Sequence, residues 1–206
     1  MSVGRFITLE GGEGVGKTTQ LRALAEALRG RGLEVVTTRE PGGSEGAEAV
    51  RRLLLEGGED RWSAPAEALL FAAARTDHVD KLVRPATQQG KWVLSDRFID
   101  SSLAYQGGAG GLGIEAVRAI NAFGIDGCFP DRTLLLLHPD GAERARARDG
   151  EAADRIGGRP ASYHQAVEEA FRRIAADEPR RVRLIDASGT PEEVTNRLVA
   201  ALDDLL

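Results

Sequence analysis

The pattern G-x-x-x-x-G-K-T at residues 11–18 is the part of this sequence with the clearest chemistry. Glycines let a backbone wrap closely around phosphate groups, which its N–H groups and the following helix N-terminus then bind. Lys17 would place a positive charge on the β- and γ-phosphates, and the Thr18 hydroxyl would bind Mg²⁺. The pattern therefore predicts a nucleoside triphosphate with Mg²⁺ as ligand. The residues of this loop are Gly11, Gly12, Glu13, Gly14, Val15, Gly16, Lys17 and Thr18.

The alternative interpretation of residues 11–18 is a flexible glycine loop that binds nothing. An apolar strand pattern at 6–9 precedes the loop and a helical pattern follows it. That strand-loop-helix context is the one the phosphate-binding motif requires, so it favours the functional interpretation.

A carboxylate and a guanidinium stand side by side at Asp96 and Arg97, directly after an apolar strand pattern at 91–95. The end of such a strand is where a second acidic group for Mg²⁺ belongs, although Asp is also favoured as a helix N-cap. The planar fork of Arg97 suits a second phosphate group. Its alternative is a surface salt bridge.

An aromatic residue and an arginine, Phe71 and Arg75, are four residues apart and so share one helix face. They could stack on a base and hydrogen-bond its edge, but on this spacing alone a core phenylalanine with a solvated arginine is the simpler interpretation. A short polar run follows later in the chain, with Ser101, Ser102, Tyr105 and Gln106.

Five arginines lie in a segment that is rich in Gly and Asp and poor in apolar residues: Arg144, Arg146, Arg148, Arg155 and Arg159. That composition suggests a mobile flap, and arginines on a flap can stabilise charge on a phosphoryl group in transfer. A charged, solvated helix explains the cluster equally well.

Alternating strand and helix patterns must position these groups. Apolar strands are predicted at 6–9, 34–38, 91–95, 133–137 and 181–185, and helices at 17–29, 45–55, 65–84, 100–106, 114–123, 142–148, 160–176 and 191–205. Pro85 is expected to close the helix at 65–84. Five strands separated by helices predict an α/β three-layer sandwich, with a parallel sheet covered by helices on both faces. Ligands of such sheets bind beyond the carboxyl ends of the strands, where all these candidate groups fall.

The composition predicts one cytoplasmic domain. A chain of 206 residues suits a single α/β domain, 1–206, and its net charge of -5 disfavours a bulk nucleic-acid or anionic-membrane binder. Cys128 is the only cysteine, so an internal disulfide is excluded and a reducing compartment fits. Neither a signal-peptide pattern nor an apolar run of roughly 18 residues is present. The three histidines lack metal-site spacing.

Several motifs together resemble bacterial thymidylate kinases, a family within the P-loop NTPase class. They are F-I-T-L-E-G-G-E-G-V-G-K-T-T at 6–19, T-R-E-P-G-G at 38–43, F-A-A-A-R at 71–75, S-D-R-F-I-D-S-S-L-A-Y-Q-G-G at 95–108 and R-A-R-A-R at 144–148. The resemblance covers essentially the whole chain in order. It implies transfer of the γ-phosphoryl group of ATP to dTMP, with Mg²⁺ as cofactor and a homodimer as assembly. Kinases of other nucleosides or nucleotides, and a nucleotide-dependent switch, are the alternatives.

The resemblance also implies roles for single residues on the acceptor side. Phe71 would stack on thymine, and Arg75 would hydrogen-bond its O4. Arg97 would hold the acceptor phosphate, and Glu13 would face the deoxyribose 3′-hydroxyl. Ser102, Tyr105 and Gln106 would line the base and sugar pocket, with Tyr105 crowding a 2′-hydroxyl, and Arg51 would lie near it.

Metal and catalytic groups follow from the same resemblance. Thr18 and Asp96 would bind the metal, and Glu40 would help to set the loop and the metal's water near the phosphates. Because the P-loop has no arginine, a lid at about 142–160 would supply the catalytic cation. Arg148 is the first choice for this catalytic cation and Arg155 is the second. Lys17 and Arg97 are the other residues that we expect to be catalytic. Gly157-Gly158-Arg159-Pro160 and Leu137-His138-Pro139 depart from the family's usual pattern near this lid.

Overall fold

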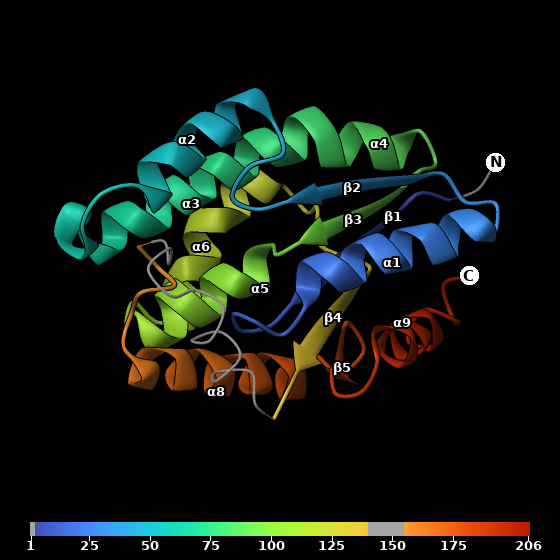
Figure 1. Cartoon of the computed structure of the whole chain (residues 1–206). Coiled ribbons are helices and arrows are strands. Elements are labelled where there is room, and N and C mark those ends of the chain that lie inside the picture. The colour runs from blue at the N-terminus through green and yellow to red at the C-terminus, as the bar shows by residue number, and fades with distance from the viewer. Residues whose placement is uncertain (1–2, 140–154) are drawn as a thin grey trace.

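The computed structural model describes residues 3–139 and 155–206 and contains a five-stranded parallel sheet in the order β2-β3-β1-β4-β5 (Figure 1). The strands are β1 (Arg5–Glu10), β2 (Val35–Arg39), β3 (Trp92–Asp96), β4 (Arg132–Leu137) and β5 (Val182–Asp186). Each predicted strand is present, with both ends within one residue of the prediction. The predicted fold class, a parallel sheet with helices around it, is confirmed.

Each face of the sheet is covered by its own set of helices, because successive strand residues point to opposite faces. Ile7, Leu94 and Leu136 pack with the apolar sides of α1 (Lys17–Gly30) and α9 (Pro191–Ala200). Phe6, Val93 and Leu135 pack with the helices of the opposite face. Those helices are α3 (Ala64–His78), α5 (Ile99–Ser102), α6 (Ile114–Ile125) and α8 (Ala161–Asp177).

The remaining helical segments are shorter or irregular. α2 (Glu45–Leu55) packs on α3, and a 3₁₀ turn, η1 (Glu59–Arg61), joins them. Two π-helical segments, η2 (Val79–Val83) and η3 (Leu103–Ala109), continue α3 and α5 respectively. The predicted helix at 142–148 lies outside the described residues. Among those described, none of the helices is long and apolar enough to span a bilayer.

Pro85 does not end the long helix, which corrects the prediction that residues 65–84 form a helix closed by this proline. The chain passes through η2 into α4 (Arg84–Gln88), and Pro85 lies in the first turn of α4. Proline is tolerated there because its missing N–H is one that a helix start leaves unused. Pro85 therefore marks the boundary between two helical segments without breaking the run of helical residues from α3 through η2 to α4.

The order of the strands places the glycine loop at the centre of one sheet edge. β1 lies between β3 and β4, which connect outward in opposite directions. A crevice forms beyond the carboxyl ends of the strands at such a switch point. The loop after β1 and the Asp96-Arg97 pair at the end of β3 therefore meet there.

Candidate functional site

The glycine loop after β1 adopts a tight conformation that holds a buried ammonium group. Gly11 has φ 136°, and a Cβ at this position would lie 2.4 Å from the carbonyl oxygen of Leu136. Lys17 Nζ donates to the carbonyl oxygens of Gly12 (2.6 Å) and Gly11 (3.2 Å). Burial lowers the pKa of Lys17 to about 8. The loop therefore keeps a desolvated cation where a phosphate oxygen would be its stronger partner.

A hydroxyl and a carboxylate meet beside this ammonium. Thr18 Oγ1 donates to Asp96 Oδ2 at 2.7 Å, and both residues line a cavity of about 120 Å³ with Glu13, Lys17 and Arg97. Within residues 3–139 and 155–206, no group of three or more His, Cys, Asp or Glu residues could hold a metal ion. A hydroxyl–carboxylate pair suits Mg²⁺, which completes its shell with water and substrate phosphates instead of many protein ligands.

Arg97 links the end of β3 to the glycine loop. Its backbone is left-handed, with φ 71°, which is uncommon outside glycine. Its guanidinium donates to Glu13 Oε1 (2.5 Å), to the Gly11 carbonyl oxygen (3.0 Å) and to Ser101 Oγ (3.0 Å). Arg97, and secondarily Lys17, lower the pKa of Glu13 to about 2 against the effect of burial. The ionised carboxylate of Glu13 thus occupies part of the Arg97 guanidinium, whose fork of N–H groups also suits a phosphate.

A second cavity, of about 220 Å³, opens on the other side of Arg97. Its wall contains all eight residues predicted for the acceptor nucleotide: Glu13, Arg51, Phe71, Arg75, Arg97, Ser102, Tyr105 and Gln106. They come from the glycine loop, α2, α3, the end of β3, α5 and η3. The structure thus brings together side chains that are up to 93 residues apart in the sequence, from Glu13 to Gln106.

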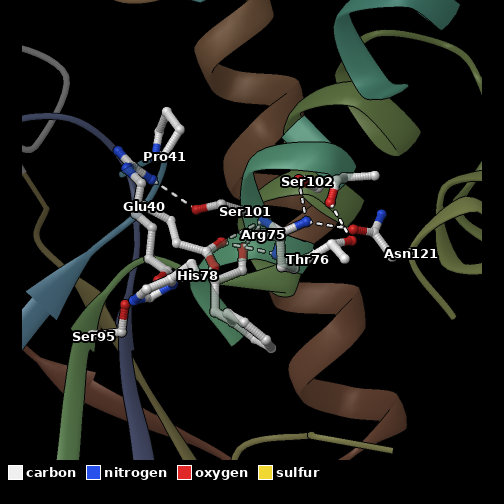
Figure 2. Close-up of polar contacts among 12 residues, drawn as sticks. Glu40, Pro41, Arg75, Thr76, His78, Ser95, Ser101, Ser102 and Asn121 are labelled. Carbon is white, nitrogen blue, oxygen red and sulfur yellow. Dashed lines mark hydrogen bonds and ion pairs between the residues drawn. The ribbon is translucent and has the colours of Figure 1, made fainter. Parts of the chain in front are cut away.

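The guanidinium of Arg75 is held by other groups of the protein (Figure 2). Nε donates to Glu40 Oε2 at 2.8 Å, and Nη2 forms an ion pair with the same oxygen at 2.8 Å. Nη1 donates to Ser102 Oγ (3.1 Å) and Asn121 Oδ1 (2.6 Å), and Nη2 donates to the Phe98 carbonyl oxygen (3.0 Å). These hydrogen bonds use four of the five N–H donors of the side chain. The protein thus holds the Arg75 guanidinium in place at the wall of the cavity, and its contact with thymine O4 stays a prediction.

The carboxylate of Glu40, which is predicted to help set the loop and the metal's water, is bound by side chains of α3. Its Oε2 binds Arg75, and its Oε1 lies 2.9 Å from His78 Nδ1. His78 is fully buried, and its Nε2 lies 2.8 Å from Thr38 Oγ1. Both carboxylate oxygens are thus committed to α3, as Figure 2 shows. Glu40 is part of a buried polar network that orients Arg75, and it lines the larger cavity with Thr18 and Asp96. Its role near the metal stays a prediction.

The structure describes only one of the two lid arginines that we predicted to be catalytic. Arg148 lies outside the described residues. Arg155 is buried, donating to Glu67 Oε2 (2.5 Å) and to the Leu54 carbonyl oxygen (2.9 Å), and its neighbour Ile156 lines the larger cavity. In this arrangement Arg155 is held by Glu67 and Leu54, next to a lining residue of that cavity.

Sequence reasoning did not single out Glu67 or Asn121, and of His78 it established only that the three histidines lack metal-site spacing. A signal for Glu67 was present, since Glu67, Phe71 and Arg75 are each four residues apart and share a face of α3. His78 lies one further turn along that helix. Asn121, on α6, gave no comparable signal, because its partner lies 46 residues away in the chain.

Comparisons with known proteins agree with this geometry. A family model described as thymidylate kinase matches residues 9–198. A thymidylate kinase of Rhizorhabdus wittichii is 63% identical over 205 residues, covering 98% of this chain and 99% of the relative. One from Bradyrhizobium diazoefficiens is 48% identical, covering 98% and 90%.

A solved structure, the thymidylate kinase of Ehrlichia chaffeensis, superposes with a TM-score of 0.81. It is 32% identical in sequence, and the match covers 97% of this chain and 99% of that one. The fold, the two adjoining cavities and these relatives lead to one conclusion. The chain belongs to the thymidylate kinase family.

Proposed function

We propose that this chain performs the reaction of its family, transfer of the γ-phosphoryl group of ATP to dTMP, at the junction of its two cavities. The observation that carries the proposal is that Glu13, Thr18, Asp96 and Arg97 line both cavities. A donor phosphate in the smaller cavity would therefore meet an acceptor phosphate in the larger one. We assign the protein to the cytoplasm, where a single unpaired cysteine is ordinary.

On the donor side, the loop N–H groups and Lys17 bind the ATP phosphates. Thr18 and Asp96 would hold Mg²⁺, which neutralises charge on the phosphate oxygens when it is bound. Lys17 exchanges its two carbonyl partners for phosphate oxygens, and this gain favours the bound state.

On the acceptor side, Arg97 binds the dTMP phosphate through its guanidinium fork, which releases Glu13 to contact the deoxyribose 3′-hydroxyl. Phe71 stacks on the base, and Tyr105 closes the space that a 2′-hydroxyl would need. Arg51, which donates to the Pro41 carbonyl oxygen at 2.6 Å, fixes the loop after β2 beside the same cavity. Ser102 and Gln106 face the base edge.

In this proposal the lid supplies the positive charge that stabilises the phosphoryl group during transfer. Arg148 remains our first choice for the catalytic cation. Arg155 would have to leave Glu67 before it could reach the phosphates, so it remains our second choice.

A coupled ADP-release assay across dTMP, dUMP, UMP, CMP and AMP tests the proposed function. We expect dTMP to give the highest kcat/KM. If dTMP is no better than CMP or AMP, the proposal fails. Single-turnover ATP hydrolysis without any phosphorylated acceptor would instead support a nucleotide-dependent switch.

The pKa of Lys17 predicts an alkaline limit on ATP use. The ammonium is charged below its pKa of about 8 and neutral above it, so only the low-pH form binds phosphate strongly. We expect kcat/KM for ATP to fall roughly tenfold per pH unit above that value. Because bound phosphates raise the pKa of Lys17, kcat at saturating ATP should stay level to a higher pH. The measurement is a pH profile from about 6.5 to about 10.

The matched control for this profile is Lys17→Arg, whose guanidinium stays charged throughout the range. Its activity will be lower, but its profile should lack the alkaline limb of the wild type. A wild-type kcat/KM for ATP that stays level to the top of the range would contradict the assignment of Lys17 as a titrating phosphate ligand.

We further propose a homodimer through the face formed by α3 and α6. These helices pack on each other, and their outer side leaves Leu69 56% and Phe123 92% exposed. Exposed alanines lie on the same two helices at Ala73, Ala116, Ala119 and Ala122. Large apolar side chains grouped in this way are typical of protein–protein interfaces.

Phe123→Glu should convert this dimer to a monomer, because a carboxylate would have to be buried without a partner. Light scattering after size exclusion measures the change. Leu184→Glu is the control, since Leu184 is as exposed as Leu69, at 56%, but lies on β5 away from the proposed face. If both variants keep the wild-type mass, the α3–α6 face is not the interface.

A further inference from the structure

A buried carboxylate with three donors lies behind the wall of the acceptor cavity. Glu67, on α3, is 2% exposed. Its Oε2 accepts from Arg155 (2.5 Å) and Arg159 (2.8 Å), and its Oε1 accepts from Gln106 Nε2 (2.9 Å). All three contacts are donated to Glu67, and a carboxylate can accept hydrogen bonds but cannot donate them.

This contact sets the orientation of the Gln106 amide. A side-chain amide can turn either its NH₂ or its oxygen toward a neighbour, but only NH₂ can pair with a carboxylate. Gln106 is 3% exposed and lines the cavity, and no described residue donates to its Oε1. With NH₂ turned toward Glu67, the amide presents its oxygen, an acceptor, on its other side toward the cavity.

Ser102, a second residue of the pocket, is left with a hydrogen-bond donor instead of an acceptor. Arg75 Nη1 donates to Ser102 Oγ at 3.1 Å, and a guanidinium cannot accept a hydrogen bond. The Ser102 hydroxyl therefore keeps its own proton for a partner elsewhere, and Ser102 also lines the cavity. Ser102 and Gln106 are four residues apart on the continuous α5–η3 helix, so a donor and an acceptor lie about one turn apart.

We propose that Glu67 is a positioning residue that determines pyrimidine specificity by fixing the Gln106 amide with its oxygen toward the base. This inference rests on the proposed function. Thymine and uracil present a carbonyl oxygen at C4 beside an N3–H donor, which match the Ser102 proton and the Gln106 oxygen. Cytosine presents an amino group beside a bare N3, so it would meet a donor with a donor and an acceptor with an acceptor.

Glu67→Gln tests the proposal, because it should reverse the Gln106 amide without changing the size of the substituted side chain. Arg155 and Arg159 still require an acceptor, so the introduced amide would turn its oxygen toward them and its NH₂ toward Gln106. Gln106 would then flip to accept that NH₂ and would present its own NH₂ to the base. We expect the ratio of kcat/KM for dTMP to that for dCMP to fall roughly 10- to 100-fold, the size of a buried mismatch.

dUMP provides an internal control, since uracil has the same C4 and N3 groups as thymine. The dTMP to dUMP ratio should stay within about twofold in Glu67→Gln, whereas simple structural damage would lower activity on all three acceptors alike. Calorimetric Kd values for dTMP and dCMP give the same comparison without turnover, and circular dichroism checks the fold.

Two further variants separate amide orientation from the arginine contacts. Arg159→Gln removes one partner of Glu67 but keeps the Gln106 contact, so the dTMP to dCMP ratio should stay within about twofold. In a Gln106→Leu background there is no amide to orient, so Glu67→Gln should leave the ratio unchanged. If Glu67→Gln preserves the ratio in the wild-type background, or still lowers it in Gln106→Leu, this inference is overturned. Failure of the wild type to phosphorylate dTMP would overturn the proposed function instead.

Discussion

Arg97→Ala should lower kcat/KM for dTMP by roughly 10²- to 10³-fold, equivalent to about 3 to 4 kcal/mol of transition-state stabilisation. Arg97 is the guanidinium that lines both cavities, and a fork-shaped contact to phosphate supplies two charge-assisted hydrogen bonds. Steady-state kinetics with dTMP varied at saturating ATP measure the effect. The loss should appear in kcat as well as KM, since the contact strengthens as charge shifts during transfer.

Arg97→Lys is the matched variant, since it keeps the charge and the left-handed backbone but lacks the fork. We expect it to recover only part of the loss. KM for ATP should change little in either variant, because Lys17 and the loop bind the donor. An Arg97→Ala enzyme with unchanged kcat/KM for dTMP would remove this residue from the site.

Glu40→Gln should lower the free energy of unfolding by about 3 to 5 kcal/mol, because it neutralises the partner of a buried guanidinium. The side chains of Glu40 and Arg75 are 3% and 2% exposed, so water cannot solvate the Arg75 guanidinium once the charge of Glu40 is removed. The amide would also turn an NH₂ group toward either Arg75 or His78. Urea denaturation followed by circular dichroism measures the change, and an unaltered m-value would show that both proteins unfold to similar states.

Two comparisons separate a structural role of Glu40 from a role in metal binding. Glu168→Gln removes one partner of an exposed pair with Arg172 and should cost less than about 0.5 kcal/mol. The Mg²⁺ concentration needed for half-maximal rate should be the same in Glu40→Gln as in the wild type. A stable Glu40→Gln protein with a greatly raised Mg²⁺ requirement would instead support the predicted role of Glu40 near the metal.

Local patterns were sufficient to predict the framework of this protein. Apolar runs bounded by turn residues marked the strands, and the spacing of Leu21, Leu24 and Leu28 marked the first helix. The eight acceptor residues could be named because a family resemblance supplied their roles, and the structure places all of them on one cavity. From spacing alone, Phe71 and Arg75 were indistinguishable from an ordinary helix face.

Long-range partners were the part that the sequence could not predict. Whether Glu40 faces a metal or a guanidinium depends on where α3 packs against the loop after β2, and no local pattern encodes that placement. The continuation of the helix past Pro85 depends on the π-helical turn before it, which has no clear sequence signature. Arg75 illustrates the same limit, because acceptors from distant parts of the chain together satisfy four of its donors.

The left-handed backbone of Arg97 is a strained conformation that the contacts of the same residue's side chain offset. A non-glycine residue at φ 71° costs on the order of 1 kcal/mol, and glycine would relieve that cost. Glycine would also remove the guanidinium that pairs with Glu13 and donates to Ser101, and breaking such a partly buried pair costs more than the strain it relieves. The cation shared by the two cavities therefore also holds the strained backbone of its own residue in place, so stability and activity select the same side chain at position 97.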